Sequence, residues 1–186
     1  MAEQPMRADA RRNRDRILVA AREAFAGAGL AVPLDEIAAR AGVGPGTVYR
    51  HFPTKEALFQ AVITERVAGL VAEARRRATD DDAGEAFFGF LALLGAEGAA
   101  KRDTSDAMTV PGPIIAELHE AVGVLLTRAQ DAGAVRPRVT TEDLFAFLKS
   151  LLATVHDAGD QDRGERLLAI LADGLRATGP RGPAAA

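Results

Sequence analysis

Residues 34–52 read LDEIAARAGVGPGTVYRHF and predict two short helices joined by a glycine turn. Gly42 stands where the end of a helix favours a left-handed residue, and Pro45 stands in the first turn of the next helix, where its missing N–H costs nothing. Helices this short are unstable alone and must pack against a third helix. A tight helix-turn-helix is one way to hold its second helix in the major groove of DNA.

The composition of the chain narrows its class. It has 186 residues, of which 48% are apolar, enough to bury a sizeable core. Its apolar runs are shorter than the roughly 20 residues of a membrane span, and the polar residues 1–16 do not resemble a signal peptide. The absence of cysteine excludes disulfides, cysteine-based zinc sites and thiol nucleophiles. We therefore expect a cytoplasmic protein with no membrane partner.

Charge is unevenly distributed along the chain. Residues 1–60 contain 9 Arg and Lys against 7 Asp and Glu, which leaves 14 basic against 19 acidic residues in the remainder. A mildly positive head on an acidic body suits a small DNA-reading domain joined to a module that does not bind DNA.

Periodic apolar residues, together with abundant Ala and Leu and few aromatic residues, predict helices rather than sheets. The expected helices span about residues 10–28, 34–42, 45–52, 54–78, 87–94, 113–132, 140–155 and 167–175. The helix around Phe87 is apolar on more than one side, so we expect it to be buried within a bundle. The glycine- and proline-rich residues 95–113 are expected to be irregular, with at most a short helix near 106–110.

Several residues mark expected helix ends. Gly29 ends the first helix, Thr54 offers an N-cap to the fourth, and Thr140 with Asp143 forms a capping-box pattern. Residues 1–9 are expected to form a flexible arm and residues 178–186 a disordered tail. The expected domains are residues 1–54 for the arm and helix-turn-helix, residues 55–177 for a helical body whose first helix connects to the head, and residues 178–186 for the tail.

The second helix of the motif has two distinct faces at 100° per residue. Val48 and Phe52 face the core of the head, and Tyr49 lies at the edge between the faces. The outer face carries Gly46, Thr47, Arg50 and His51. Arginine can read guanine, threonine can contact base edges or a thymine methyl, and histidine and tyrosine can reach phosphates. Alternatively, Tyr49 and Phe52 belong only to the core and His51 is an ordinary surface residue.

Residues 10–60 resemble the DNA-binding head of TetR-family transcriptional regulators. The resemblance rests on Arg16-Ile17-Leu18, Ala20-Ala21, Phe25, Gly29-Leu30, Leu34, Ile37-Ala38, Ala41-Gly42-Val43, Gly46-Thr47-Val48-Tyr49, His51-Phe52, Lys55, Glu56 and Leu58. It implies an all-α fold, with a three-helix helix-turn-helix head followed by a helical ligand-binding and dimerisation bundle. It also implies DNA contacts at Pro45, Gly46, Thr47, Tyr49, Arg50, His51 and Lys55. The chain departs from many relatives at Val32-Pro33-Leu34, where they have a Ser or Thr cap. The resemblance therefore does not carry over a phosphate contact from a capping side chain at this position.

The implied function is that of a ligand-responsive, sequence-specific regulator, a repressor acting as a homodimer on a pseudo-palindromic operator in double-stranded DNA. The effector is an unknown small molecule; the alternative is control by a protein partner. Three histidines, no cysteine and scattered acids give no catalytic constellation, so we expect no enzymatic activity, no cofactor and no metal.

The body offers candidates for two further surfaces. The last two helices carry wide apolar stripes, so the expected dimer interface comprises Leu144, Leu148, Leu151, Leu152, Val155, Leu167, Leu168, Leu171 and Leu175. Candidate ligand-binding residues are Phe87, Phe90, Leu91, Leu94, Met108, Ile115, His119, Phe145, Lys149 and His156. His119 and His156 could supply polar groups to an apolar cavity. Each candidate could equally be ordinary core or surface.

Overall fold

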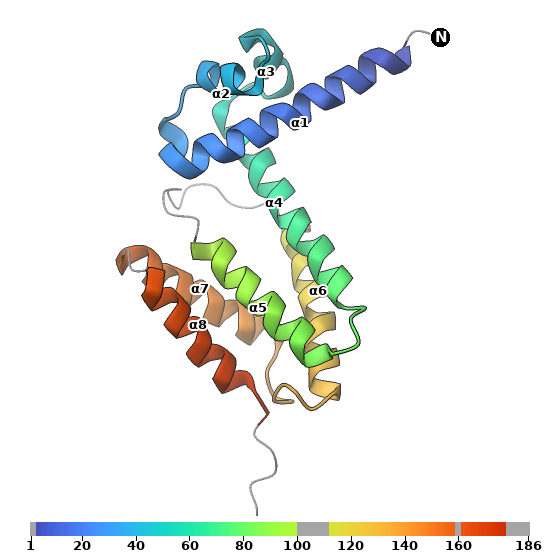
Figure 1. Ribbon diagram of the computed structural model, residues 1–186, viewed down its shortest axis with the longest axis vertical. Helices are drawn as coiled ribbons and strands as arrows, with labels where there is room; N and C mark the ends of the chain where they lie inside the picture. Colours follow the sequence, from blue (N-terminus) through green and yellow to red (C-terminus); the bar gives the residue numbers. More distant parts are fainter. Residues whose placement is uncertain (1–2, 100–111, 159–160, 178–186) are drawn as a thin grey trace, which may run out of the picture. The chain divides into compact units, whose positions relative to one another are not determined.

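The computed structural model describes residues 3–99, 112–158 and 161–177, with the side chains of 3–7, 28, 98–99, 152–158 and 161–162 left out (Figure 1). Within these ranges the fold is all-α, as predicted, with eight α-helices and no strand. The helices are α1 (Glu3–Ala28), α2 (Leu34–Ala41), α3 (Pro45–His51), α4 (Lys55–Arg77), α5 (Ala83–Ala99), α6 (Gly112–Asp131), α7 (Thr141–Ala158) and α8 (Gln161–Leu175). A short 3-10 helix, η1 (Gly29–Ala31), follows α1. None of the described helices combines the length and apolar character that crossing a bilayer requires.

The described residues form two compact units, which divide within α4 between Arg66 and Val67. The boundary predicted from the sequence, at residue 54, assigns all of α4 to the body. In the structure, the first turns of α4 belong to the core of the head. Phe59 of α4 packs edge to face against Phe25 of α1, with ring centroids 5.3 Å apart. Leu58 is fully buried beside them. Burial of these side chains explains why the head includes part of α4.

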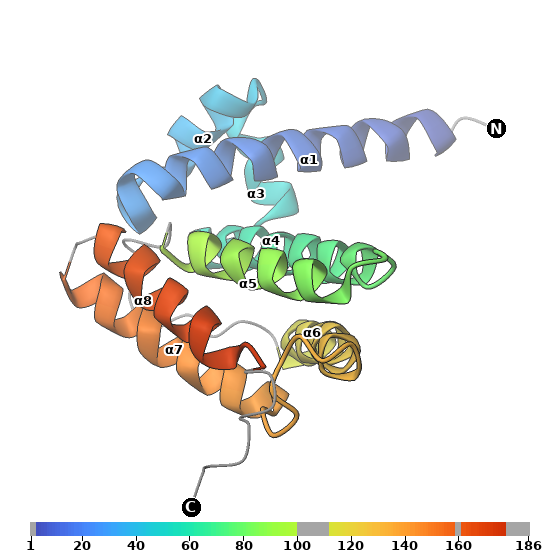
Figure 2. The same cartoon turned by 60° about the horizontal axis from the view of Figure 1, so that its bottom comes forward.

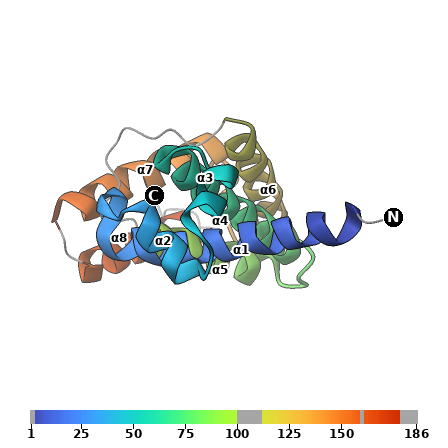
Figure 3. The same ribbon diagram turned by 90° about the horizontal axis from the view of Figure 1, so that it is seen from above.

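The first unit is built on α1, which packs against both α2 and α3. Ile17, Ile37 and Val48, one from each helix, are all fully buried. Figures 2 and 3 show the N-terminal turns of α1 projecting beyond α2 and α3. This helix begins at Glu3, so the expectation of a flexible arm over residues 1–9 is wrong for residues 3–9. Pro5 lies in the first turn, where the missing N–H of proline breaks no helical hydrogen bond.

The second unit is a bundle around α5, which contacts α6, α7 and α8 (Figure 2). Phe87, Phe90 and Leu91 are almost completely buried, which confirms the prediction of a buried helix. This helix continues to Ala99, so the expected irregular segment does not begin at Gly95. Any Cβ at Gly95 would collide with the side chain of Leu168. The glycine therefore permits close approach of α8 rather than ending α5. The short helix expected near 106–110 lies outside the described residues.

Local signals set several of the helix ends. The Thr140 hydroxyl accepts the Asp143 N–H and the Asp143 carboxylate accepts the Thr140 N–H, both at 3.1 Å, which confirms the capping box before α7. The Thr54 hydroxyl accepts the Ala57 N–H at 3.1 Å and caps α4. At the far end of the bundle, the Arg136 N–H donates to the Leu175 carbonyl and the Ala177 N–H to the Ala134 carbonyl, both at 3.0 Å. This backbone pairing ties the end of α8 to the α6–α7 connection.

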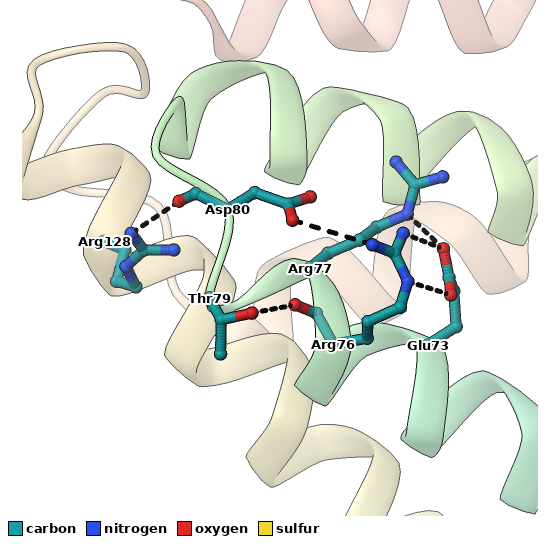
Figure 4. A network of polar contacts seen from close by, with 6 residues as sticks. All are labelled: Glu73, Arg76, Arg77, Thr79, Asp80 and Arg128. Carbon is teal, nitrogen blue, oxygen red and sulfur yellow. Dashed lines mark hydrogen bonds and ion pairs between the residues drawn. The ribbon is translucent and has the colours of Figure 1, made fainter.

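The end of α4 is held by the polar network of Figure 4. Arg76 donates two hydrogen bonds to the Glu73 carboxylate, at 2.8 and 2.9 Å, and Arg77 donates a third at 2.6 Å. These bonds lower the pKa of Glu73 from 4.5 to about 2 and raise that of Arg76. Arg128 of α6 donates to the Asp80 carbonyl at 2.8 Å. Arg75, the residue before Arg76, pairs with Glu117 of α6 at 3.4 Å, so all three arginines in the last turn of α4 have intramolecular partners.

Candidate DNA-binding site

Helix α3 presents the predicted outer face to solvent. Its first residue is Pro45, and it ends where the N–H of the extended residue Phe52 donates to the Val48 carbonyl at 2.8 Å. Val48 and Phe52 are buried, as the helical period predicts. The other side of the helix is accessible: Pro45, Gly46, Tyr49 and Arg50 are exposed, and Thr47 and His51 are partly exposed.

Two of these side chains are free to bind a ligand. The Tyr49 side chain is 49% exposed, although tyrosine is often buried. Within the part of the chain that the structure describes, neither the Tyr49 hydroxyl nor the Arg50 guanidinium has a hydrogen-bond or ion-pair partner. A guanidinium carries five N–H donors in a planar fork that matches phosphate or the edge of guanine. The outer face of α3 therefore carries exposed donors, on a fixed helix, that no described residue engages.

The turn before α3 depends on Gly42. This residue caps α2 with φ +63° and ψ +37°, the left-handed conformation predicted from the sequence. Arg16 of α1 donates to the Gly42 carbonyl at 3.0 Å, and its guanidinium occupies the space that a Cβ on Gly42 would need. The glycine is thus required both for its conformation and for the close approach of Arg16.

Two further cations hold the head together in ways that the sequence analysis missed. The Arg14 guanidinium lies over the Phe52 ring, 5.5 Å from its centroid. The Lys55 ammonium, part-buried, donates to the Leu30 carbonyl at 2.9 Å. One of its three donors is therefore engaged, and the others remain for the predicted phosphate contact. Spacing offers a signal for Arg14 alone, because it lies four residues before the buried Leu18 and hence on the same face of α1.

Helix α2 begins without a side-chain cap. Pro33 occupies its N-cap, directly before the first turn rather than within it, and the Pro33 carbonyl accepts the Glu36 and Ile37 N–H groups. Asp35 and Glu36 lie in the first turn of α2, where their negative charges interact favourably with the positive end of the helix dipole.

Only some of the residues expected at the dimer interface are accessible to solvent. Leu144, Leu148 and Leu175 are buried within their own unit, whereas Leu151, Leu167, Leu168 and Leu171 are partly exposed. The side chains of Leu152 and Val155 lie outside the described residues. The large apolar side chains that these helices expose are Phe147 on α7, 60% exposed, and Ile170 on α8, 67% exposed. Sequence reasoning missed both, although each lies on an apolar stripe.

The candidate ligand residues are also partly dispersed. Phe87, Phe90, Leu91 and Leu94 are buried on α5, Ile115 is partly exposed and Lys149 is exposed. The structure brings His119 of α6 and Phe145 of α7 together in a parallel stack, with centroids 3.8 Å apart. The side chains of Met108 and His156 lie outside the described residues.

One open hollow of about 480 Å³ lies beside the α6–α7 connection and the end of α8. It is lined by Arg136, Pro137, Arg138, Val139, Asp143, Phe147, Leu175 and Ala177, and by none of the candidate ligand residues. Among the described side chains, no group of three or more His, Asp and Glu residues could hold a metal ion.

Comparisons with known proteins cover both units. Residues 17–62 match the family model of bacterial regulatory proteins of the tetR family, and residues 82–177 match that of the C-terminal domain of SbtR-like transcriptional regulators. The crystal structure of a TetR transcription regulatory protein from Mycobacterium vanbaalenii has 41% identity and a TM-score of 0.70, covering 92% of this chain and 99% of that one. A TetR transcriptional regulator from Streptomyces coelicolor has 33% identity and a TM-score of 0.74, covering 89% and 99%.

A curated relative matches over a shorter length. The HTH-type transcriptional activator FasR of Mycolicibacterium smegmatis is 41% identical over 87 residues, 42% of this chain and 40% of that protein. The match thus spans about two fifths of this relative. The SbtR-like model alone matches more than half of the chain, and the M. vanbaalenii protein is similar over nearly its whole length. Because these matches agree with the helix-turn-helix head and the helical body, the chain belongs to the TetR family of DNA-binding transcriptional regulators.

Proposed function

We propose that this chain is a ligand-responsive repressor that binds a pseudo-palindromic operator as a homodimer. The observation that carries the proposal is the outer face of α3, where Tyr49 and Arg50 are exposed and have no partner among the described residues. Two such helices related by a two-fold axis read two half-sites of an operator. Repression then needs only occupancy of the operator, because a bound dimer excludes other proteins from that DNA.

Each residue of the site has a proposed role. Arg50 and Thr47 contact base edges, since their side chains carry the donors and the methyl group that the major groove recognises. Tyr49, His51 and Lys55 donate to phosphates and fix the register of the head. Pro45 and Gly46 open the helix beside the DNA, and the space around Gly46 is free of protein atoms, so the backbone can approach closely.

Dimerisation and ligand control are supported by features of the body. Phe147 and Ile170 expose large apolar side chains on the neighbouring helices α7 and α8, and contact with a second copy of the chain would bury both. The His119–Phe145 stack combines an aromatic surface with polar ring nitrogens, which suits a small apolar effector with a hydrogen-bonding group. A ligand controls DNA binding only if its affinity differs between two states of the protein. A body that answers to a protein partner is the second candidate.

The proposal is tested by selecting bound duplexes from random DNA with the purified chain at a fixed, near-physiological salt concentration. We expect enrichment of a pseudo-palindrome. Tyr49→Ala should bind the selected site about a hundredfold more weakly, because each of the two subunits loses a hydrogen bond to a charged group that contributes about 1.5 kcal/mol or more. Its thermal unfolding should match the wild type, since the side chain is exposed. Failure of the wild type to enrich any sequence would contradict the proposal, and unchanged affinity of Tyr49→Ala would remove Tyr49 from the contacts.

Ligand control is tested on the same selected site. A small apolar molecule that changes operator affinity and raises the melting temperature of the chain supports it, because a ligand stabilises the state that it binds. A response to a purified protein partner alone would favour the second candidate.

A further inference from the structure

One face of α1 changes character along its length. Leu18 and Phe25 are buried against the rest of the head. Arg11 lies seven residues before Leu18, and positions seven apart on a helix differ by only about 20° around the axis. Arg14 lies between them on the same face, three residues after Arg11. The stripe that is apolar inside the head therefore continues as arginine toward the N-terminus of α1. The N-terminal turns of this helix project beyond α2 and α3 (Figures 1 and 3).

The cationic stripe passes beside the end of the recognition helix. Arg14 lies over the ring of Phe52, the residue that directly follows α3. The rings of Phe52 and His51 are neighbours, with centroids 6.2 Å apart. Arg11 is one turn further along α1, about 4.5 Å along the axis at 1.5 Å per residue. The stripe thus extends outward from the side of the head where α3 ends.

Arg11 and its neighbour Arg12 differ in their partners. Arg12 forms an ion pair with Asp9, one turn earlier on the same helix. Arg11 is exposed and, within the described part of the chain, has neither an ion-pair nor a hydrogen-bond partner. At 100° per residue the two side chains point in clearly different directions around the helix. Arg11 is therefore a cation on the stripe without a protein partner in the described part of the chain, whereas Arg12 is paired with an acid and points away from the stripe.

We propose that Arg11, which follows Arg14 outward along the stripe, binds phosphates of the DNA backbone that flank the bases read by α3. The proposal rests on the DNA binding proposed above and adds a contact from outside the helix-turn-helix. Phosphate contacts of this kind position a protein on the duplex without reading its sequence. An unpaired arginine on a rigid helix suits this role, because each phosphate that it neutralises releases condensed counterions.

The test measures the salt dependence of DNA binding for Arg11→Ala, with Arg12→Ala as the matched control on the same helix. Each lost phosphate contact should reduce the slope of log K against log salt by about 0.9 per bound subunit. If the variant and the wild type bind equally at about 1 M salt, this change makes the variant bind about eightfold more weakly per subunit at about 0.1 M salt. We expect this reduction for Arg11→Ala, equally on the selected operator and on unrelated DNA. Arg12→Ala should retain most of the wild-type slope.

Duplex length provides the second measurement. On an operator trimmed to the bases that α3 reads, the flanking phosphates are gone, so wild type and Arg11→Ala should bind equally. The proposal is overturned if Arg11→Ala keeps the wild-type slope, if Arg12→Ala loses as much, or if trimming leaves the difference between the variants unchanged. A wild type that selects no operator contradicts the proposed function instead, so the two failures are distinguishable.

Discussion

Single side chains in the head either fix α3 or remain free to bind. Arg16 reaches the Gly42 carbonyl and Arg14 covers Phe52, so both arginines act within the protein. Arg50 makes no such contact with the described residues and stays available on the outer face. The residue type alone does not separate these roles, because all three are exposed arginines within or near the same motif. The separation comes from which element each guanidinium reaches.

Glu73 offers a prediction on pH at the scale of one residue. Its folded pKa of about 2 lies below the ordinary 4.5, so its ionised form stabilises the fold above pH 4.5, and this contribution is lost as the pH falls toward 2. Glu73→Gln should lower the free energy of unfolding at pH 7 by at most about 1 kcal/mol, because the carboxylate is partly exposed and screened. Denaturant unfolding should show this difference shrinking between pH 4.5 and pH 3. A difference that is constant with pH would contradict the assigned ion pairs.

The turn between α2 and α3 gives a prediction at the scale of an element. Gly42→Ala should destabilise the head by about 1–2 kcal/mol, because alanine is strained in the left-handed region and its Cβ displaces Arg16. Gly46→Ala adds the same methyl group inside α3 with open space around it, so it should instead stabilise by about 0.5–1 kcal/mol. Thermal and denaturant unfolding of both variants measure the difference. Equal effects of the two substitutions on unfolding would show that the left-handed conformation of Gly42 does not determine the stability of the head.

Elements could be predicted where the chain carries its own boundary signals. Thr140 with Asp143 and the left-handed Gly42 are such signals, and helical period alone separated the buried Val48 from the exposed Arg50. No such signal in the sequence marks the start of α1 or the continuation of α5 through Gly95. Gly95 reads as a helix breaker until Leu168 is known to pack against it. The contacts of Arg14 and Lys55 are likewise tertiary. Spacing places Arg14 on the buried face of α1 but does not identify Phe52 as its partner.

At the scale of the whole molecule, α4 passes from one compact unit into the other and contributes buried residues to both. In the proposed dimer, the body contributes to DNA recognition by pairing two heads. Val67 and Val71, on the body side of the division within α4, are buried, as are residues of α5 and α6. The proposed dimer surface is that of α7 and α8, where Phe147 and Ile170 are the most exposed of the large apolar side chains that the structure describes.

The dimer proposal predicts the effect of Phe147→Glu combined with Ile170→Glu. Burial of each side chain contributes about 1.5–3 kcal/mol, and a two-fold interface counts each twice, so the dissociation constant should rise more than about a thousandfold. Sedimentation should show a helical monomer that binds a half-site but no longer binds the operator cooperatively. Val124→Glu, at a side chain on α6 that is 49% exposed, is the matched control and should remain dimeric. A double variant that still sediments as a dimer would place the interface elsewhere, because charges at these positions cannot be buried without partners.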